Sequence, residues 1–96
     1  MIRRIVRMHF LETYVPEFIR LFNERKGHIL NFPGCVSLEL YQDADTPGVW
    51  YTWSSWQSVE DLEHYRQSPF FRDTWKSIKP QFLVPPQAFT LRSENE

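Results

Sequence analysis

Histidine and cysteine, the side chains most often used for acid–base and nucleophilic chemistry, are few in this sequence and lie far apart. His9 would titrate near neutral pH if it lay beside Glu39, although a paired structural histidine is the commoner role. His28 and His64 have charged or polar neighbours, so we interpret both as solvated. Cys35 is the only cysteine, which excludes an internal disulfide and a cysteine-based zinc site and favours a small buried side chain.

The carboxylates and glycines form no motif for a metal or a nucleotide. The carboxylates fall mainly on expected helix surfaces and in a turn at 43–46, and the three histidines lack paired ligand spacing. The three glycines do not form a glycine-rich phosphate loop. Eleven basic and twelve acidic residues give a net charge of −1, so no positive field attracts nucleic acid or an anionic membrane. We therefore expect no metal, no cofactor and no nucleic-acid partner.

The chain has the length of one domain, and its amino end does not resemble a targeting segment. Charged and apolar residues alternate directly after Met1, and no apolar run approaches the ~18 residues that a membrane span needs. We expect a cytoplasmic protein without a membrane partner, with a single domain over residues 1–92. The last four residues, SENE at 93–96, are expected to form a loose tail.

The densest group of large side chains is WYTWSSW at 50–56, which holds three tryptophans and a tyrosine in seven positions. Such an aromatic-rich segment is typical of a β-strand. Alternation places the even-numbered residues, from Trp50 to Trp56, on one face and Tyr51 and Trp53 on the other. Both faces are therefore aromatic, whereas a sheet in a small protein ordinarily buries only one.

Four strands and two helical stretches are expected around this segment. Residues 2–10, 35–42 and 50–56 alternate, and 85–92 supplies a last short strand after two prolines. Residues 15–31 have apolar positions at three- and four-residue steps, and 58–82 is a second helical stretch interrupted near Ser68 and Pro69. The order βαββαβ predicts an α+β, ferredoxin-like fold: a four-stranded antiparallel sheet with its helices on one face.

The two faces of this sheet are expected to pack against different partners, one against the helices of the chain and the other against a second copy of the sheet. Seven residues should lie beneath the helices: Val6, Met8, Val36, Leu38, Leu40, Trp50 and Trp56. The opposite face would carry Ile5, Tyr41, Tyr51 and Trp53. This patch is too apolar to be left in water, so we expect a second copy of the sheet to cover it in a homodimer.

With its elements in this order, the chain resembles the antibiotic biosynthesis monooxygenase family, small ferredoxin-like proteins that pair as dimeric α/β barrels. The resemblance runs from Ile2 to about Leu91 and is carried by FPGC at 32–35, LELYQDADTPGVWYTWSSW at 38–56 and WQSVEDLEHYRQSPFFRDTW at 56–75. It implies a pocket between sheet and helices in which molecular oxygen oxidises a flat aromatic substrate, often without metal or flavin. The walls of this pocket would be Val6, Met8, Phe22, Trp50, Trp56, Tyr65, Phe71 and Trp75.

Residues used by two branches of the family are replaced in this chain. Haem-degrading members carry an asparagine, a tryptophan and a histidine where this chain has Val6 or Arg7, then Tyr65 and Trp75. No iron ligand is left, so the resemblance does not imply haem degradation. Isomerase-like members carry a glutamate and a histidine at the positions of Ser54 and Tyr65, so their acid–base pair is missing.

The polyketide-oxidising branch shares one residue with this chain. Its members carry an asparagine and a tryptophan four residues apart on the third strand, and Thr52 and Trp56 have this spacing. The resemblance implies a cofactor-independent monooxygenase for a small aromatic or quinol substrate, with Trp56 and Tyr65 shaping the pocket and Thr52 and Ser54 offering hydrogen bonds. Two alternatives stay open: a non-catalytic dimeric module that binds a hydrophobic metabolite, and a structural dimer domain whose own tryptophans fill the pocket.

Overall fold

The computed structural model describes residues 1–94, which form four strands, three α-helices and two short 3₁₀ helices. In chain order these are β1 (Ile2–His9), η1 (Glu12–Tyr14), α1 (Val15–Leu30), β2 (Cys35–Gln42), β3 (Val49–Trp56), α2 (Val59–Arg66), α3 (Pro69–Ile78), η2 (Lys79–Gln81) and β4 (Gln87–Arg92). The predicted order βαββαβ is confirmed. Of the tail predicted at 93–96, residues 95 and 96 lie outside the described residues.

The second helical stretch divides into α2 and α3 where the sequence predicts an interruption. The Ser68 hydroxyl accepts a hydrogen bond of 3.1 Å from the backbone N–H of Phe71, and Pro69 occupies the first turn of α3. Ser58 caps α2 in the same way, accepting from Asp61 N–H at 3.1 Å. No helix within residues 1–94 is long and apolar enough to cross a membrane.

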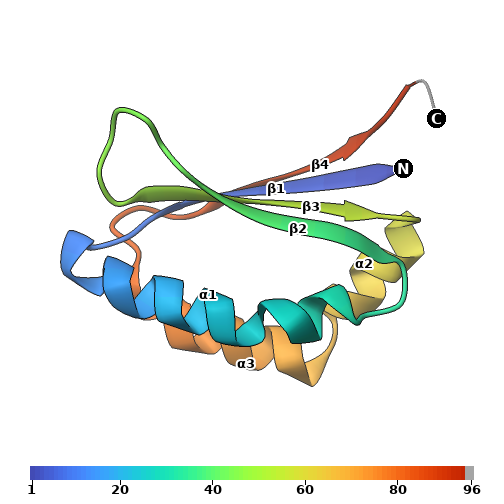
Figure 1. The fold of residues 1–96 in the computed structure, drawn as a ribbon, viewed down its shortest axis with the longest axis horizontal. Helices are drawn as coiled ribbons and strands as arrows, with labels where there is room; N and C mark the ends of the chain where they lie inside the picture. Colours follow the sequence, from blue (N-terminus) through green and yellow to red (C-terminus); the bar gives the residue numbers. More distant parts are fainter. Residues whose placement is uncertain (95–96) are drawn as a thin grey trace.

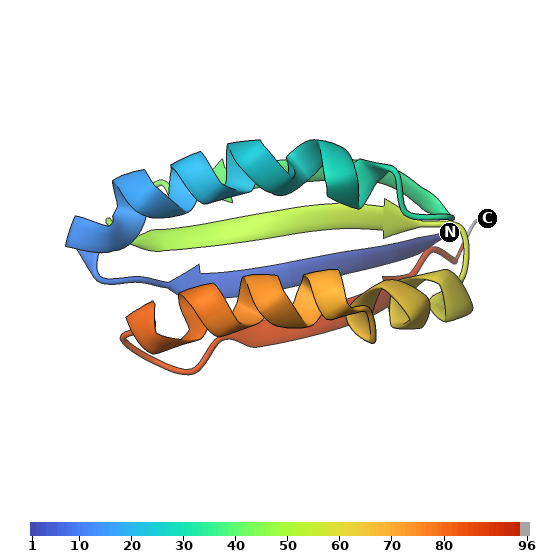
Figure 2. The same cartoon turned by 90° about the horizontal axis from the view of Figure 1, so that it is seen from below.

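The strands form one antiparallel sheet in the order β2-β3-β1-β4. All the helices lie on one face of this sheet, and the opposite face carries no element of the chain within the described residues (Figure 1). Viewed from the helix side, α1 lies over the β2 side of the sheet and α3 over the β4 side, with β3 and β1 visible between them (Figure 2). The predicted ferredoxin-like architecture is confirmed.

The strand register decides which side chains face the helices. Met8 pairs with Trp50 across β1 and β3, so the even-numbered residues of both strands share the helix face. Val36 was expected on this face, but it is 47% exposed. A β-bulge between Cys35 and Ser37 shifts the register there, and Cys35 pairs with Trp56 instead.

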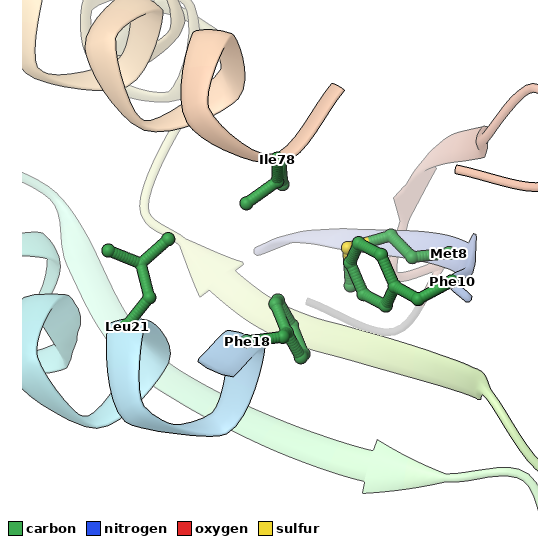
Figure 3. Packing of buried hydrophobic residues seen from close by; sticks show 5 residues of the cluster. All are labelled: Met8, Phe10, Phe18, Leu21 and Ile78. Atoms are coloured by element: carbon green, nitrogen blue, oxygen red, sulfur yellow. The ribbon is translucent and has the colours of Figure 1, made fainter. Parts of the chain in front are cut away.

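The main core cluster lies beneath α1 and α3. It contains five buried residues, drawn in Figure 3: Met8, Phe10, Phe18, Leu21 and Ile78. The ring of Phe10 lies 4.4 Å from that of Phe18, centroid to centroid, and is fully buried. A second cluster of Ile2, Trp56 and Leu62 holds α2 against the sheet.

A glycine turn brings α2 close to the sheet. Gly34 has φ +83°, which L side chains rarely adopt, and a Cβ at this position would clash with the Asp61 side chain of α2. The Gly34 carbonyl also accepts a 2.8 Å hydrogen bond from Gln57 N–H, immediately after β3. The turn after α1 therefore helps to set the position of α2, which carries Tyr65 and Arg66.

Candidate functional site

A cavity of about 110 Å³ lies between the sheet and the helices α1, α2 and α3. Its walls are mainly apolar and include residues of both core clusters. Nine residues predicted for the site line this cavity: Val6, Met8, Phe22, Thr52, Ser54, Trp56, Tyr65, Phe71 and Trp75. The structure therefore brings these side chains, from two strands and three helices, around one space.

Trp50 was predicted to line the cavity but does not. Its side chain shares the helix face with Trp56 but packs against the main core cluster, with its ring 6.4 Å from that of Phe18. Alternation predicts the face on which a residue lies but not which part of that face borders the cavity. The first turns of α1 lie against this end of β3.

Trp56 forms a rigid wall of the cavity. Its side chain is fully buried, and its indole ring stacks on Tyr65 with 5.1 Å between ring centroids and an interplanar angle of 23°. The indole Nε1–H donates a 3.0 Å hydrogen bond to Ser54 Oγ. The Ser54 hydroxyl in turn donates a 3.5 Å hydrogen bond to the carbonyl oxygen of Arg4. Ser54 is therefore already engaged, and its clearest role is to hold Trp56.

Tyr65 is held by aromatic contacts on several sides. Phe32 and Phe71 meet its ring edge-on, with centroids 5.0 and 5.1 Å away. Burial raises the pKa of Tyr65, and the neighbouring Cys35 thiol raises it further. The phenol thus stays protonated at neutral pH and suits hydrogen-bond donation rather than proton abstraction.

Cys35, which was predicted to be buried, is only half-buried. Burial raises the pKa of its thiol, which a hydrogen bond to the Ser37 carbonyl only partly offsets. A cysteine that is mainly in the thiol form is a poor nucleophile at neutral pH.

Three arginines that were not among the predicted site residues also line the cavity: Arg4, Arg25 and Arg66. Arg25 is well satisfied, because it donates to Thr74 Oγ1 at 2.7 Å and pairs with Asp73 at 3.3 Å. The periodicity carries a signal for all three. Arg4 lies two residues before Val6 and four before Met8, so it shares their face of β1. Arg25 and Arg66 lie on the apolar stripes of their helices.

Arg4 and Arg66 have fewer partners. Arg4 Nη1 donates to the neutral Thr90 hydroxyl at 2.6 Å, and Arg66 Nη1 pairs with Glu63 at 2.6 Å. The Arg66 Nε is buried and has no hydrogen-bond partner among the described residues. Burial lowers the pKa of Arg4, the positive charge of Arg66 lowers it further, and the negative charge of Glu63 partly offsets these two effects.

The other candidate groups lie away from this cavity. His9 is not beside Glu39 as considered above, because β3 separates their strands and the Glu39 carboxylate accepts a 2.7 Å hydrogen bond from Tyr41. His28 stacks on Phe70 at 3.9 Å, and His64 is exposed on α2. Within residues 1–94, no aspartate, glutamate or histidine lines the cavity, and there is no group of three or more side chains that could hold a metal ion.

The opposite sheet face, which we call the bare face, has a hollow lined by Ile5, Tyr41, Tyr51 and Trp53. The rings of Tyr41 and Trp53 meet edge-on, with centroids 6.5 Å apart. Because Phe89 pairs with Ile5 across β1 and β4, it extends the bare face, and half of its surface is exposed. The four predicted dimer-face residues thus form one continuous patch.

Comparison with known proteins finds the same architecture elsewhere. A family model described as antibiotic biosynthesis monooxygenase matches residues 1–77. A conserved protein from Methanosarcina mazei Go1 superposes with a TM-score of 0.91 at 18% identity, covering 97% of this chain and 92% of that one. A Mycobacterium tuberculosis protein gives 0.89 at 20% identity, covering 99% and 96%. A structure described as antibiotic biosynthesis monooxygenase gives 0.88 at 15% identity, covering 97% and 98%. A search of curated proteins gave no match.

Proposed function

Because the chain belongs to the antibiotic biosynthesis monooxygenase family, we propose that it is a monooxygenase that oxidises a small phenolic or quinol substrate with molecular oxygen, without metal or flavin. The observation that carries this proposal is the cavity, with Trp56, Tyr65, Phe71 and Trp75 in its walls. Aromatic walls suit a flat aromatic ligand, because ring faces and edges attract one another beyond simple burial. They also exclude water from reactive oxygen intermediates.

The size of the cavity favours a substrate with a single ring. Its volume of about 110 Å³ is below the ~150 Å³ of an engineered apolar cavity that binds benzene. A single ring would therefore need some of the lining side chains to shift, and its substituents would lie toward the rim. A polycyclic substrate would require the helices to move apart.

The proposed reaction balances with oxygen as the only oxidant. The phenol loses its proton, and the phenolate passes one electron to O₂, giving a phenoxyl radical and superoxide. These combine in a C–O bond at a ring carbon that carries hydrogen, opposite the phenolic oxygen in a simple phenol and adjacent to it in a hydroquinone. Loss of the proton on that carbon and cleavage of the O–O bond leave a quinone and hydroxide, which takes up the first proton. One phenol and one O₂ thus give one quinone and one water.

The residues of this chain would bind and orient the substrate rather than abstract its proton. Trp56 and Trp75 would hold the ring, while Tyr65 and Thr52 would donate hydrogen bonds to its oxygens. No carboxylate or imidazole among the described residues lines the cavity, so the phenolate has to come from the acidity of the substrate itself. The rate should therefore rise with pH toward the pKa of the phenol used.

The test is oxygen uptake with a panel of single-ring phenols and hydroquinones, with ¹⁸O₂ to trace one labelled atom into the quinone product. Tyr65→Phe should lower kcat/KM, whereas Tyr51→Phe, the same change on the bare face, should leave it unaltered. Oxygen uptake that equals the protein-free rate across the panel, at pH values above the substrate pKa, would contradict the proposal.

We also propose that the protein is a homodimer joined through the bare face. Tyr41, Trp53 and Phe89 are 47%, 39% and 50% exposed there. Tyrosine, tryptophan and phenylalanine are enriched in interface cores, and a two-fold axis would let this patch cover its own copy.

A second candidate function is a binding module without catalysis. It is favoured by the same lack of a lining acid–base group among the described residues. Saturable binding of a single-ring ligand, with no product formed under air, would support this function and contradict the first.

A further inference from the structure

We propose that Arg4 and Arg66 form an anion-binding subsite in the wall of the cavity, and that the ligand of this cavity is an aromatic carboxylate. This proposal rests on the proposed function only in taking the ligand to be a single-ring aromatic molecule. It adds the chemical group by which that molecule would be recognised.

The fold brings the two guanidinium groups together from distant parts of the chain. Arg4 lies in β1, opposite Ser54 of β3 and Thr90 of β4, and its position in the alternation puts it on the helix face. Arg66 ends α2, one residue after Tyr65. Both arginines line the same cavity. A ligand ring against Trp56 and Tyr65 would therefore have two cations near its edge.

The hydrogen bonds of these two arginines are incomplete, unlike those of Arg25. Arg25 has both a hydroxyl and a carboxylate partner and lies 5.4 Å from the Phe70 ring centroid. Arg4 bonds a neutral hydroxyl and has no carboxylate hydrogen-bond partner among the described residues. Arg66 has one carboxylate partner, yet its Nε remains buried without an acceptor in this part of the chain. Such an atom costs free energy unless a ligand supplies the acceptor.

The ordinary structural roles explain only part of this arrangement. Arg66 pairs with Glu63 three residues earlier and lies at the carboxyl end of α2, where a cation is favoured. A surface pair of this kind leaves the Nε in water, however, and here it is buried. Burial and then the charge of Arg66 lower the pKa of Arg4, and the charge of Glu63 offsets only part of this.

A carboxylate fits these requirements. Guanidinium groups bind carboxylates through two parallel N–H···O bonds, and such charge-assisted bonds are stronger than neutral ones. An anion placed near both groups would relieve their repulsion and supply acceptors to their unsatisfied N–H groups. The Glu63 carboxylate pairs with Arg66 and its charge also acts on Arg4, but Glu63 does not line the cavity, so a ligand carboxylate would add acceptors inside it.

The experiment compares 2,5-dihydroxybenzoate with 2,5-dihydroxybenzamide, which has a similar shape but no charge. Binding is measured by calorimetry under nitrogen, so turnover does not enter. We expect the carboxylate to bind at least about tenfold more tightly, the ratio expected for one charge-assisted hydrogen bond. Arg4→Gln and Arg66→Gln should each remove most of this preference, because they weaken carboxylate binding far more than amide binding. Arg72→Gln is the matched control, because Arg72 is exposed on α3 and does not line the cavity.

Equal binding of the two compounds, no binding of either, or a preference that persists in both variants would overturn the subsite. Thermal unfolding of each variant shows whether it is folded, and Arg4→Lys, which keeps the charge, should restore part of the preference. The outcomes separate the two proposals. Preference without oxygen uptake contradicts the monooxygenase function alone, whereas turnover of neutral hydroquinones without preference contradicts the subsite alone.

Discussion

Trp53 and Trp56 lie three residues apart in β3, on opposite faces of the sheet, and their surroundings differ completely. Trp56 is fully buried beneath α2, whereas Trp53 is 39% exposed on the bare face. One strand thus carries the same large side chain into an interior made by its own helices and onto a surface that this chain leaves open. The comparison shows that aromatic content alone does not identify a core.

The polar groups on the two faces are arranged differently as well. On the helix side, Trp56 Nε1–H bonds the buried Ser54 hydroxyl. On the bare face, the Tyr41 hydroxyl donates to Glu39 at 2.7 Å and the Tyr51 hydroxyl to Asp43 at 3.3 Å. Tyrosine rings whose hydroxyls form hydrogen bonds at the edge of a patch are typical of protein interfaces, and such a patch can also be exposed to water.

Trp56→Ala should give the largest effect in this comparison. Removing a fully buried indole leaves a cavity and deprives Tyr65 of its stacking partner. The free energy of unfolding should fall by about 3–5 kcal/mol, the usual cost of truncating a buried aromatic side chain. Urea unfolding at one fixed protein concentration measures this loss. Leu30→Ala is the control, because Leu30 is an exposed apolar residue on the helix side, and an equal loss in both variants would show that Trp56 is not buried in solution.

Trp53→Asp should have its main effect on assembly. A charge in the centre of the bare face would have to be desolvated in the proposed dimer, so the variant should be monomeric. Sedimentation equilibrium at micromolar concentration gives the mass directly. Leu30→Asp is the matched control, because it adds the same charge at an exposed apolar residue on the helix side. A monomeric wild type, or an intact Trp53→Asp dimer, would contradict the assignment of this face.

Alternation in the sequence is enough to predict the two faces of the sheet, because the side-chain period of a strand is two residues. It fails for Val36, because a bulge adds one residue without changing the apolar pattern. It fails for Trp50 in another way. The predicted sheet face of Trp50 is correct, but the packing of α1 against that end of β3 decides which residues reach the cavity. No local sequence pattern contains this information.

The arginines of the cavity show a different limit. Arg4 lies on the apolar face of β1, so its position was predictable, but a charged residue beside two others near the chain terminus is typical of a solvated surface. Its proximity to Arg66 depends on how α2 crosses the sheet, which the Gly34 turn helps to set. Only the assembled fold brings residues 62 positions apart to the same cavity.

Tyr65→Phe should separate chemistry from packing on the helix side. The ring contacts with Trp56 and Phe71 are kept, so the free energy of unfolding should change by no more than about 1.5 kcal/mol, the range of one hydrogen bond. If the hydroxyl donates to the substrate, kcat/KM should fall by about tenfold, as expected for one lost hydrogen bond. Steady-state oxygen uptake measures it, and an unchanged kcat/KM with a large loss of stability would assign Tyr65 to packing alone.

Asp43→Asn should give the smallest effect and concerns the support of the bare face. The Asp43 carboxylate accepts from the backbone N–H groups of Thr46 and Asp45, at 2.9 and 3.1 Å, and from the Tyr51 hydroxyl. The Thr46 bond, followed by that of Asp45, lowers the pKa of Asp43 below its ordinary value of 3.8. The lowered pKa means that the folded state favours the ionised form, so the stabilisation is complete above this value and is lost as the pH falls below it.

The difference in Tm between wild type and Asp43→Asn should therefore be constant from neutral pH down to about pH 5 and shrink below pH 3.8. Thermal unfolding followed by circular dichroism across this range measures it. Asp45→Asn is the control in the same turn, because Asp45 contributes its backbone N–H rather than its carboxylate to this bond. A Tm difference that grows toward acid pH would mean that the folded state disfavours the ionised form of Asp43. Packing on the bare face, rather than the hydrogen bond to Asp43, would then hold Tyr51 in place.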